Sequence, residues 1–219
     1  MVFIANTRLP SEKAMGYYIA QMCQAFAETG VSAQLLYPRR LQGDPSMVGV
    51  GVHEYYGVPP VFTARALPNL DVIRLENYIP SRIFPLFVLA HGLGWGLYGA
   101  LAARRERPDL YFTTDIRLAF WLTRLGLPTA YESHWLPRRS QRAMLSWIAR
   151  SRRLKLVVTL TSGLRDHYVD MRFPARKVSV LPMGADLTHF EGLPSKKECR
   201  IRLGIPPDRT VVGYVGRFN

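Results

Sequence analysis

The sequence predicts an α/β domain built on a mostly parallel, doubly wound sheet. Two observations lead to this fold class. Short apolar runs of strand type alternate with amphipathic stretches along almost the whole chain. The composition, 48% hydrophobic and 21% charged over 219 residues, is that of a globular protein. Strands separated by helices pair in parallel through right-handed crossovers, so one sheet covered by helices follows.

The predicted strands are short apolar runs, most of them with β-branched or aromatic side chains. A Gly- and Pro-rich segment, Leu41–Pro68, shows no clean period and is predicted as a loop with small elements. The strands expected from these runs are Val2–Asn6, Ser32–Tyr37, Asp71–Leu75, Leu110–Thr113, Pro128–Glu132, Leu156–Leu160, Val178–Leu181 and Thr210–Val215.

Helices are predicted where apolar residues recur at a spacing of three and four. In the first helix Ile19, Met22, Cys23 and Phe26 follow this spacing, and Gly30 ends it. The other expected helices are Ile83–Ala103, Arg117–Leu125, Arg138–Ser151, Ser162–Val169 and Lys196–Leu203.

The stretch Ile83–Ala103 is long and apolar enough to be weighed as a membrane span. It carries no formal charge over 21 residues, which is the length that crosses a bilayer. However, it contains Pro85, His91 and four glycines, and it falls where a crossover helix between two strands belongs. A span here would split the sheet, so we expect a buried or membrane-skimming helix.

Charge and cysteine content narrow the possible functions. The net charge is +13, and residues 111–160 hold nine Lys or Arg against two acids. This basic stretch suits an anionic partner such as a membrane surface, although a solvated Arg-rich helix is the simpler explanation of a charge run alone. Cys23 and Cys199 lie far apart, so neither a disulfide framework nor a cysteine zinc site is expected. No cationic segment precedes the first apolar run, and we expect a cytoplasmic protein.

Polar residues follow two neighbouring predicted strands, at the edge where parallel sheets bind ligands. Glu132 and His134 lie just past one strand, where an imidazole can bind a hydroxyl or phosphate or carry a proton. Packing of His134 beside Trp135 in a surface loop is the alternative. Asp115 follows the adjacent strand and either lines the same cleft or caps the next helix.

Two further positions are candidates for anion binding. Gly16 opens the first helix, whose backbone amides suit a diphosphate, although one glycine at a turn is also explained by conformation alone. Arg217 follows Gly216 at the end of the last predicted strand. We find no P-loop, no three-glycine dinucleotide fingerprint, no metal-ligand spacing and no Gly-x-Ser-x-Gly motif, and we expect neither a metal nor a cofactor.

The order of the motifs resembles the amino-terminal half of a family 4 glycosyltransferase of the GT-B architecture, which has two Rossmann-like domains. The resemblance covers the entire chain and departs from the family's pattern at Met15 and Met183. The segments that carry it are TRLPSEKAMG, TTD, YESHWLP, LPMGADLTHF and LGIPPDRTVVGYVGRF.

The resemblance implies a reaction that transfers a sugar from a nucleotide-sugar to an acceptor, a glycan or a lipid-linked molecule, with retention of anomeric configuration. It implies that Gly16 and Arg217 contact the donor phosphates and that His134 lies against the transferred sugar. Asp115 and Glu132 would lie in the acceptor cleft. Catalysis would rest on positioning and on stabilising charge on the leaving diphosphate.

The resemblance also implies a domain division at residue 190. Residues 1–190 would form the acceptor domain, and 191–219 a linker and the first strand of a donor domain. The lysine and the two glutamates that the family uses to hold the donor would come after Asn219, so we expect the chain to be truncated and inactive alone.

A basic surface over Arg138–Lys155 would contact an anionic membrane, and no nucleic acid is expected. The alternatives are a sugar-nucleotide epimerase of GT-B shape and a non-catalytic basic domain that binds polyanions.

Overall fold

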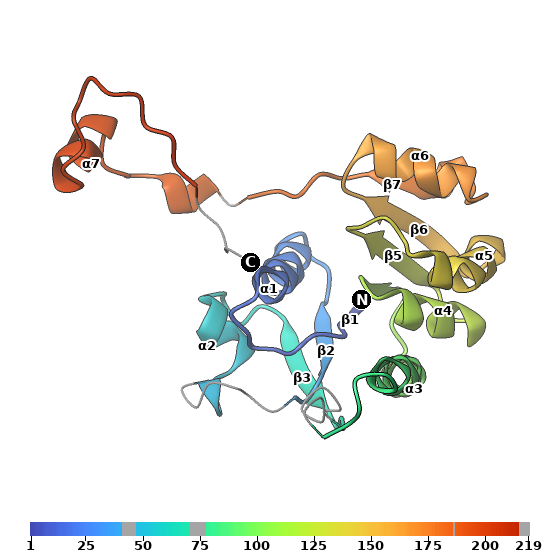
Figure 1. Cartoon of the computed structure of the whole chain (residues 1–219). Coiled ribbons are helices and arrows are strands. Elements are labelled where there is room, and N and C mark those ends of the chain that lie inside the picture. The colour runs from blue at the N-terminus through green and yellow to red at the C-terminus, as the bar shows by residue number, and fades with distance from the viewer. Residues whose placement is uncertain (41–46, 71–77, 186, 215–219) are drawn as a thin grey trace. The chain divides into compact units, whose positions relative to one another are not determined.

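The computed structural model describes residues 1–40, 47–70, 78–185 and 187–214. The chain forms two compact units, Met1–Pro182 and Met183–Asn219 (Figure 1).

The first unit is built on one seven-stranded sheet in which every pairing is parallel. The strand order is β3-β2-β1-β4-β5-β6-β7, which reverses direction between β1 and β4. The predicted parallel α/β fold is confirmed. The strands are β1 Val2–Ile4, β2 Gln34–Pro38, β3 Thr63–Leu67, β4 Tyr111–Thr113, β5 Thr129–Ser133, β6 Leu154–Thr159 and β7 Val178–Val180.

Helices cover both faces of this sheet (Figure 1). The first two pack against one face and the next four against the other, as the hydrophobic clusters show. On the first face lie α1 Ala14–Glu28 and α2 Val52–Tyr56; on the second lie α3 Phe84–Arg104, α4 Ile116–Arg124, α5 Arg142–Arg150 and α6 Ser162–Asp170, with short 3-10 turns η3 Arg139–Gln141 and η4 Ala175–Lys177.

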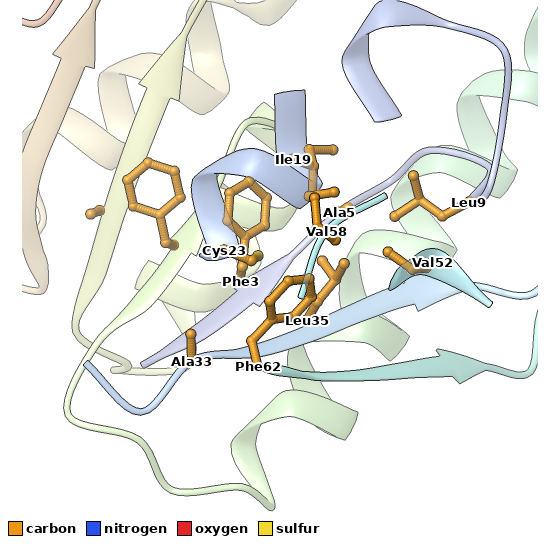
Figure 2. Packing of buried hydrophobic residues seen from close by; sticks show 13 residues of the cluster. Phe3, Ala5, Leu9, Ile19, Cys23, Ala33, Leu35, Val52, Val58 and Phe62 are labelled. Atoms are coloured by element: carbon orange, nitrogen blue, oxygen red, sulfur yellow. The ribbon is translucent and has the colours of Figure 1, made fainter. Parts of the chain in front are cut away.

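The apolar stripe of α1 packs on the first face of the sheet. Ile19 and Cys23 are buried against Phe3 of β1 and Leu35 of β2 (Figure 2). Because successive strand residues point to opposite faces, Val2 and Ile4 join the cluster under α3 and α4 instead. Burial raises the pKa of the Cys23 thiol to about 12, as expected for a core cysteine.

Glycines allow α3 to lie close to α4. A Cβ atom at Gly96 would come within 3.0 Å of the Trp121 ring and 3.2 Å of the Arg117 backbone, and one at Gly92 would meet the Arg117 side chain. The carboxyl-terminal half of α3 is therefore packed into the helix layer. By length and composition alone, this helix could cross a membrane. Only a third of its most apolar 18-residue stretch is buried inside the protein.

The structure departs from the sequence prediction at two segments. A full strand, β3 Thr63–Leu67, lies in the region expected to be loop, and only one of its side chains is buried. An edge strand needs little apolar alternation, which explains why the pattern missed it. The strand predicted at 71–75 falls outside the described residues. Residues 210–214 form no strand, and the predicted boundary at residue 190 stays a prediction.

The second unit contains a 3-10 turn, η5 Leu187–Phe190, and the short helix α7 Lys196–Arg202. Ser195 caps α7: its hydroxyl accepts a hydrogen bond from the Glu198 amide, and the Glu198 carboxylate accepts one from the Ser195 amide. This capping box explains why so short a segment is helical.

Candidate functional site

A pocket of about 380 Å³ opens at the carboxyl ends of β4 and β5, on the edge where the strand order reverses. Open parallel sheets bind ligands at this position, and the volume falls within the range of small-molecule sites. Its lining comes from the start of α1, the turn after β4 and the loop after β5: Met15, Thr114, Asp115, Ile116, Arg117, Tyr131, Ser133, His134, Trp135, Leu136, Pro137, Arg138 and Gln141.

Glu132 and His134 form a buried pair beside this pocket. Glu132 Oε2 lies 3.4 Å from His134 Nε2, and the two side chains are 3% and 7% exposed. Strand alternation turns Glu132 toward α1, where the Tyr18 hydroxyl donates a hydrogen bond to Glu132 Oε1. The Tyr18 ring packs edge-on against the His134 ring at 5.0 Å between centroids.

Glu132 Oε2 and His134 Nε2 face each other, and neither atom has another hydrogen-bond partner among the described residues. A buried polar atom without a partner costs free energy, so each of these two atoms relies on the other for its polar contact. Burial, together with the carboxylate of Glu132, raises the pKa of Tyr18, which therefore stays a hydrogen-bond donor. The carboxylate is held in place, and the imidazole can bind a hydroxyl or move a proton.

Asp115 acts as the amino cap of α4 and also lines the pocket. Its Oδ1 accepts hydrogen bonds from the amides of Arg117 and Leu118 at 2.7 and 3.2 Å. Its Oδ2 accepts one from Asn6 Nδ2 at 2.9 Å and lies 3.8 Å from Arg117 Nη1. The position of Asp115 therefore agrees with both interpretations from the sequence, the cap of the next helix and the residue that lines the cleft. Because Asn6 follows β1 and Asp115 follows β4, the hydrogen bond between them joins the two strands at which the strand order reverses.

Gly16 has a packing role in the first turn of α1. Its amide donates to the Lys13 carbonyl at 2.9 Å, and a Cβ atom there would lie 1.9 Å from the Tyr56 hydroxyl. That hydroxyl is also hydrogen-bonded to the backbone of Ser11 at 2.8 and 3.0 Å. A donor contact at Gly16 stays a prediction, although Met15 and Tyr18 on the same helix reach the pocket and its buried pair.

The other predicted site residue, Arg217, falls outside the described residues. Met183 is exposed in the second unit. In the part of the chain that the structure describes, no three His, Cys, Asp or Glu side chains gather closely enough to hold a metal ion.

Sequence reasoning missed Tyr18 and placed Arg117 and Arg138 only in the general basic stretch. Tyr18 stands one residue before the buried Ile19, at the border of the apolar stripe of α1, but its partner Glu132 is 114 residues away. No local pattern pairs such residues. Arg117 and Arg138 line the pocket and make it suitable for an anionic or hydroxyl-rich ligand.

Several solved structures share this architecture, and the three described next are about twice as long as this chain. A crystal structure of Anabaena Alr3699/HepE in complex with UDP matches with a TM-score of 0.52 and 13% identity, covering 93% of this chain and 49% of that one. The apo form of the lipopolysaccharide outer core galactosyltransferase WaaB matches with a TM-score of 0.52 and 12% identity, covering 85% of this chain and 46% of that one. Apo UGT2 of Phytolacca americana matches with a TM-score of 0.52 and 13% identity, covering 94% of this chain and 54% of that one.

These likenesses show the fold, which is that of one half of a GT-B enzyme; the chain spans about half the length of these structures. A search of curated proteins finds no match. The family model of the glycosyl transferase 4-like domain matches residues 13–184, which is most of the chain and includes Tyr18, Asp115, Glu132 and His134. The chain therefore belongs to the glycosyl transferase 4-like domain family.

Proposed function

We propose that this chain is the acceptor-side half of a retaining glycosyltransferase that uses a nucleotide-sugar donor and a glycan or lipid-linked acceptor. The observation that carries the proposal is the buried Tyr18–Glu132–His134 group beside a pocket at the reversal point of the sheet. His134 would contact the transferred sugar, and Glu132 would hold the imidazole in position. Retention follows from the family resemblance.

The donor class is supported by the solved structures of similar fold. Crystal structures of Anabaena Alr3699/HepE contain UDP, and one contains UDP-glucose. In our proposal Gly16 and Arg217 approach the donor phosphates, and Asp115 and Arg117 shape the acceptor side of the pocket. The leaving diphosphate takes the acceptor proton, so the protein contributes orientation and charge stabilisation.

Binding of UDP-glucose to the 219-residue chain tests this role of His134. We expect weak, saturable binding by calorimetry, reduced at least about tenfold in His134→Ala, the loss expected for a contact worth about 1.4 kcal/mol. The matched control is His167→Ala, because His167 is a half-buried histidine on α6, outside the pocket lining. Equal affinity in wild type and His134→Ala would contradict the assignment.

We further propose that the chain alone transfers no sugar, since the solved structures of this fold are about twice its length. The test measures turnover of UDP-glucose by the purified 219-residue protein in the presence of a panel of glycan and lipid-linked acceptors. Robust product formation would overturn this part of the proposal and leave the role of His134 open to the binding test.

Peripheral association with an anionic membrane through Arg138–Lys155 belongs to the same proposal. The cations of this run are exposed and fall into two groups: three lie at the start of α5 and four at or after its end. The first group is Arg138, Arg139 and Arg142, and the second is Arg150, Arg152, Arg153 and Lys155. Since α5 follows a strand of the parallel sheet, its start lies at the same edge as the pocket.

A further inference from the structure

The first two turns of α3 are exposed although they are entirely apolar or uncharged. Leu86, Phe87, Val88 and Leu89 are 36–64% exposed, and Ile83 just before the helix is 43% exposed. No charged residue occurs between Ile83 and Ala103. Monomeric proteins seldom leave so many large apolar side chains in contact with water at one place. We therefore expect a partner to cover this segment.

The exposure surrounds the helix instead of marking one face. Consecutive helical residues are about 100° apart, so the four side chains from Leu86 to Leu89 cover about 300° of the circumference. A protein groove buries one stripe of a docked helix, whereas lipid can surround it. All-round exposure therefore favours an acyl-chain environment over a protein partner.

The packing of α3 shows how far this end projects. Gly92 and Gly96 contact Arg117, which lies in the first turn of α4. Phe84 is eight residues before Gly92, and at 1.5 Å per residue the free end extends about 12 Å beyond that contact. The hydrocarbon core of a bilayer is about 30 Å thick, so this end reaches into one leaflet only.

The surroundings of the free end suit the surface of an anionic membrane. As a crossover helix, α3 runs opposite to the strands, so its start lies at the carboxyl edge of the sheet with the starts of α4 and η3. Arg82, Arg138 and Arg139 are exposed there. Trp135 is 79% exposed on the same edge, and aromatic side chains of this kind favour the headgroup region.

An apolar groove of about 550 Å³ continues along the flank of α3. Leu70, His91, Trp95 and Tyr98 contribute to its lining. His91 Nε2 is within hydrogen-bond distance of Asn69 Oδ1, at 3.1 Å, so this polar atom of the groove has a partner. The apolar surface thus extends from the free end of the helix toward the sheet.

We propose that the first two turns of α3 insert into one leaflet of an anionic membrane, while Arg82, Arg138 and Arg139 contact the lipid headgroups. The insertion would set the pocket edge of the sheet against the lipid surface. This inference deepens the membrane association proposed above and is independent of sugar transfer.

The test measures co-sedimentation of the 219-residue chain with phosphatidylcholine vesicles that contain phosphatidylglycerol. The variant Leu86→Glu/Phe87→Glu places two charges in the free end. The matched control is Leu101→Glu, because Leu101 is exposed on the same helix but near its other end. All substituted side chains are exposed, and circular dichroism checks that each variant is folded.

We expect the double variant to bind at least about tenfold more weakly than wild type, and Leu101→Glu to bind nearly as well as wild type. A polarity-sensitive dye on Phe87→Cys, in a Cys199→Ser background, should shift to the blue on adding vesicles, whereas the dye on Leu101→Cys should not. The remaining Cys23 is buried and unlabelled.

Two outcomes would overturn the insertion. In the first, the double variant binds vesicles as well as wild type does and high salt abolishes the binding. This result would assign the association to the basic run alone. In the second, the wild-type chain is a dimer that binds no vesicles, whereas the double variant is a monomer. This result would show that a second copy covers α3. A failure of UDP-glucose binding would leave this test unaffected.

Discussion

Tyr18, Glu132 and His134 come from segments 114 residues apart and act as one group. The Tyr18 hydroxyl donates to a carboxylate that has almost no exposed surface, and the imidazole lies on the other carboxylate oxygen. A buried carboxylate is stable only when its oxygens are satisfied. Tyr18 therefore stabilises the fold and holds the candidate catalytic pair in position.

We expect Tyr18→Phe to lower the free energy of unfolding by about 1–3 kcal/mol near neutral pH, because it leaves one oxygen of Glu132 without its donor. The pKa of Tyr18 is raised in the folded state, so its contribution is complete below the unfolded pKa of about 10 and is lost as the pH rises above it. The difference from wild type should therefore shrink at alkaline pH. Urea unfolding across this range is the measurement.

Tyr17→Phe is the control, because Tyr17 is the next residue on α1 and its ring is 44% exposed. This substitution should change the stability by less than about 0.5 kcal/mol near neutral pH. An equally small effect of Tyr18→Phe would show that the hydrogen bond to Glu132 contributes little to the fold.

At the scale of elements, α3 has two halves with different surroundings. Gly96, Gly99 and Ala100 in its second half are buried against α4 and the sheet, whereas the first two turns are exposed. Glycine is normally unfavourable inside a helix by about 1 kcal/mol relative to alanine. Its presence at Gly96 is explained by the close approach to Arg117 and Trp121, which a side chain would prevent.

Substitution of Gly96 tests this contact between helices. Gly96→Leu should lower the free energy of unfolding by at least about 1–3 kcal/mol, since the added side chain displaces α3 from α4. Gly94→Leu is the matched control: a Cβ atom at Gly94 meets nothing within 4 Å, so this variant should be neutral or slightly stabilised. Equal unfolding midpoints in urea would show that α3 does not depend on the close approach.

The sequence predicted most elements of the sheet and their order, because their apolar periodicity is local. It missed β3, whose side chains are mostly exposed or half-buried at the edge of the sheet, and it assigned a strand to Thr210–Val215 that is not formed over the described residues 210–214. A strand is stable only when it pairs with a neighbour, and pairing is a long-range property that the run Thr210–Val215 does not encode.

At the scale of the whole molecule, the core belongs to the first unit alone. All three hydrophobic clusters lie within residues 1–182. In the second unit, every residue whose burial the structure describes is exposed or half-buried. Burial of apolar surface is the main source of stability, so the first unit should fold without the second.

Removal of residues 183–219 tests this independence. We expect the melting temperature to change by less than about 2 °C, because every residue of the deleted part whose burial the structure describes is exposed or half-buried. Differential scanning calorimetry of the full and shortened chains measures it, with circular dichroism to compare helix content. A fall of more than about 5 °C would show that the second unit stabilises the first.

The sequence by itself determined the parallel α/β class, the order of most elements, the placement of Glu132 near the end of β5 and of His134 just after it, and the resemblance that the family match confirms. These properties rest on local periodicity and on motifs whose order is read along the chain. Only the tertiary structure decided that Tyr18 lies on Glu132, that Arg117 and Arg138 line one pocket, and that the first two turns of α3 are left exposed. Those contacts join distant segments, and no local pattern specifies which distant side chains meet.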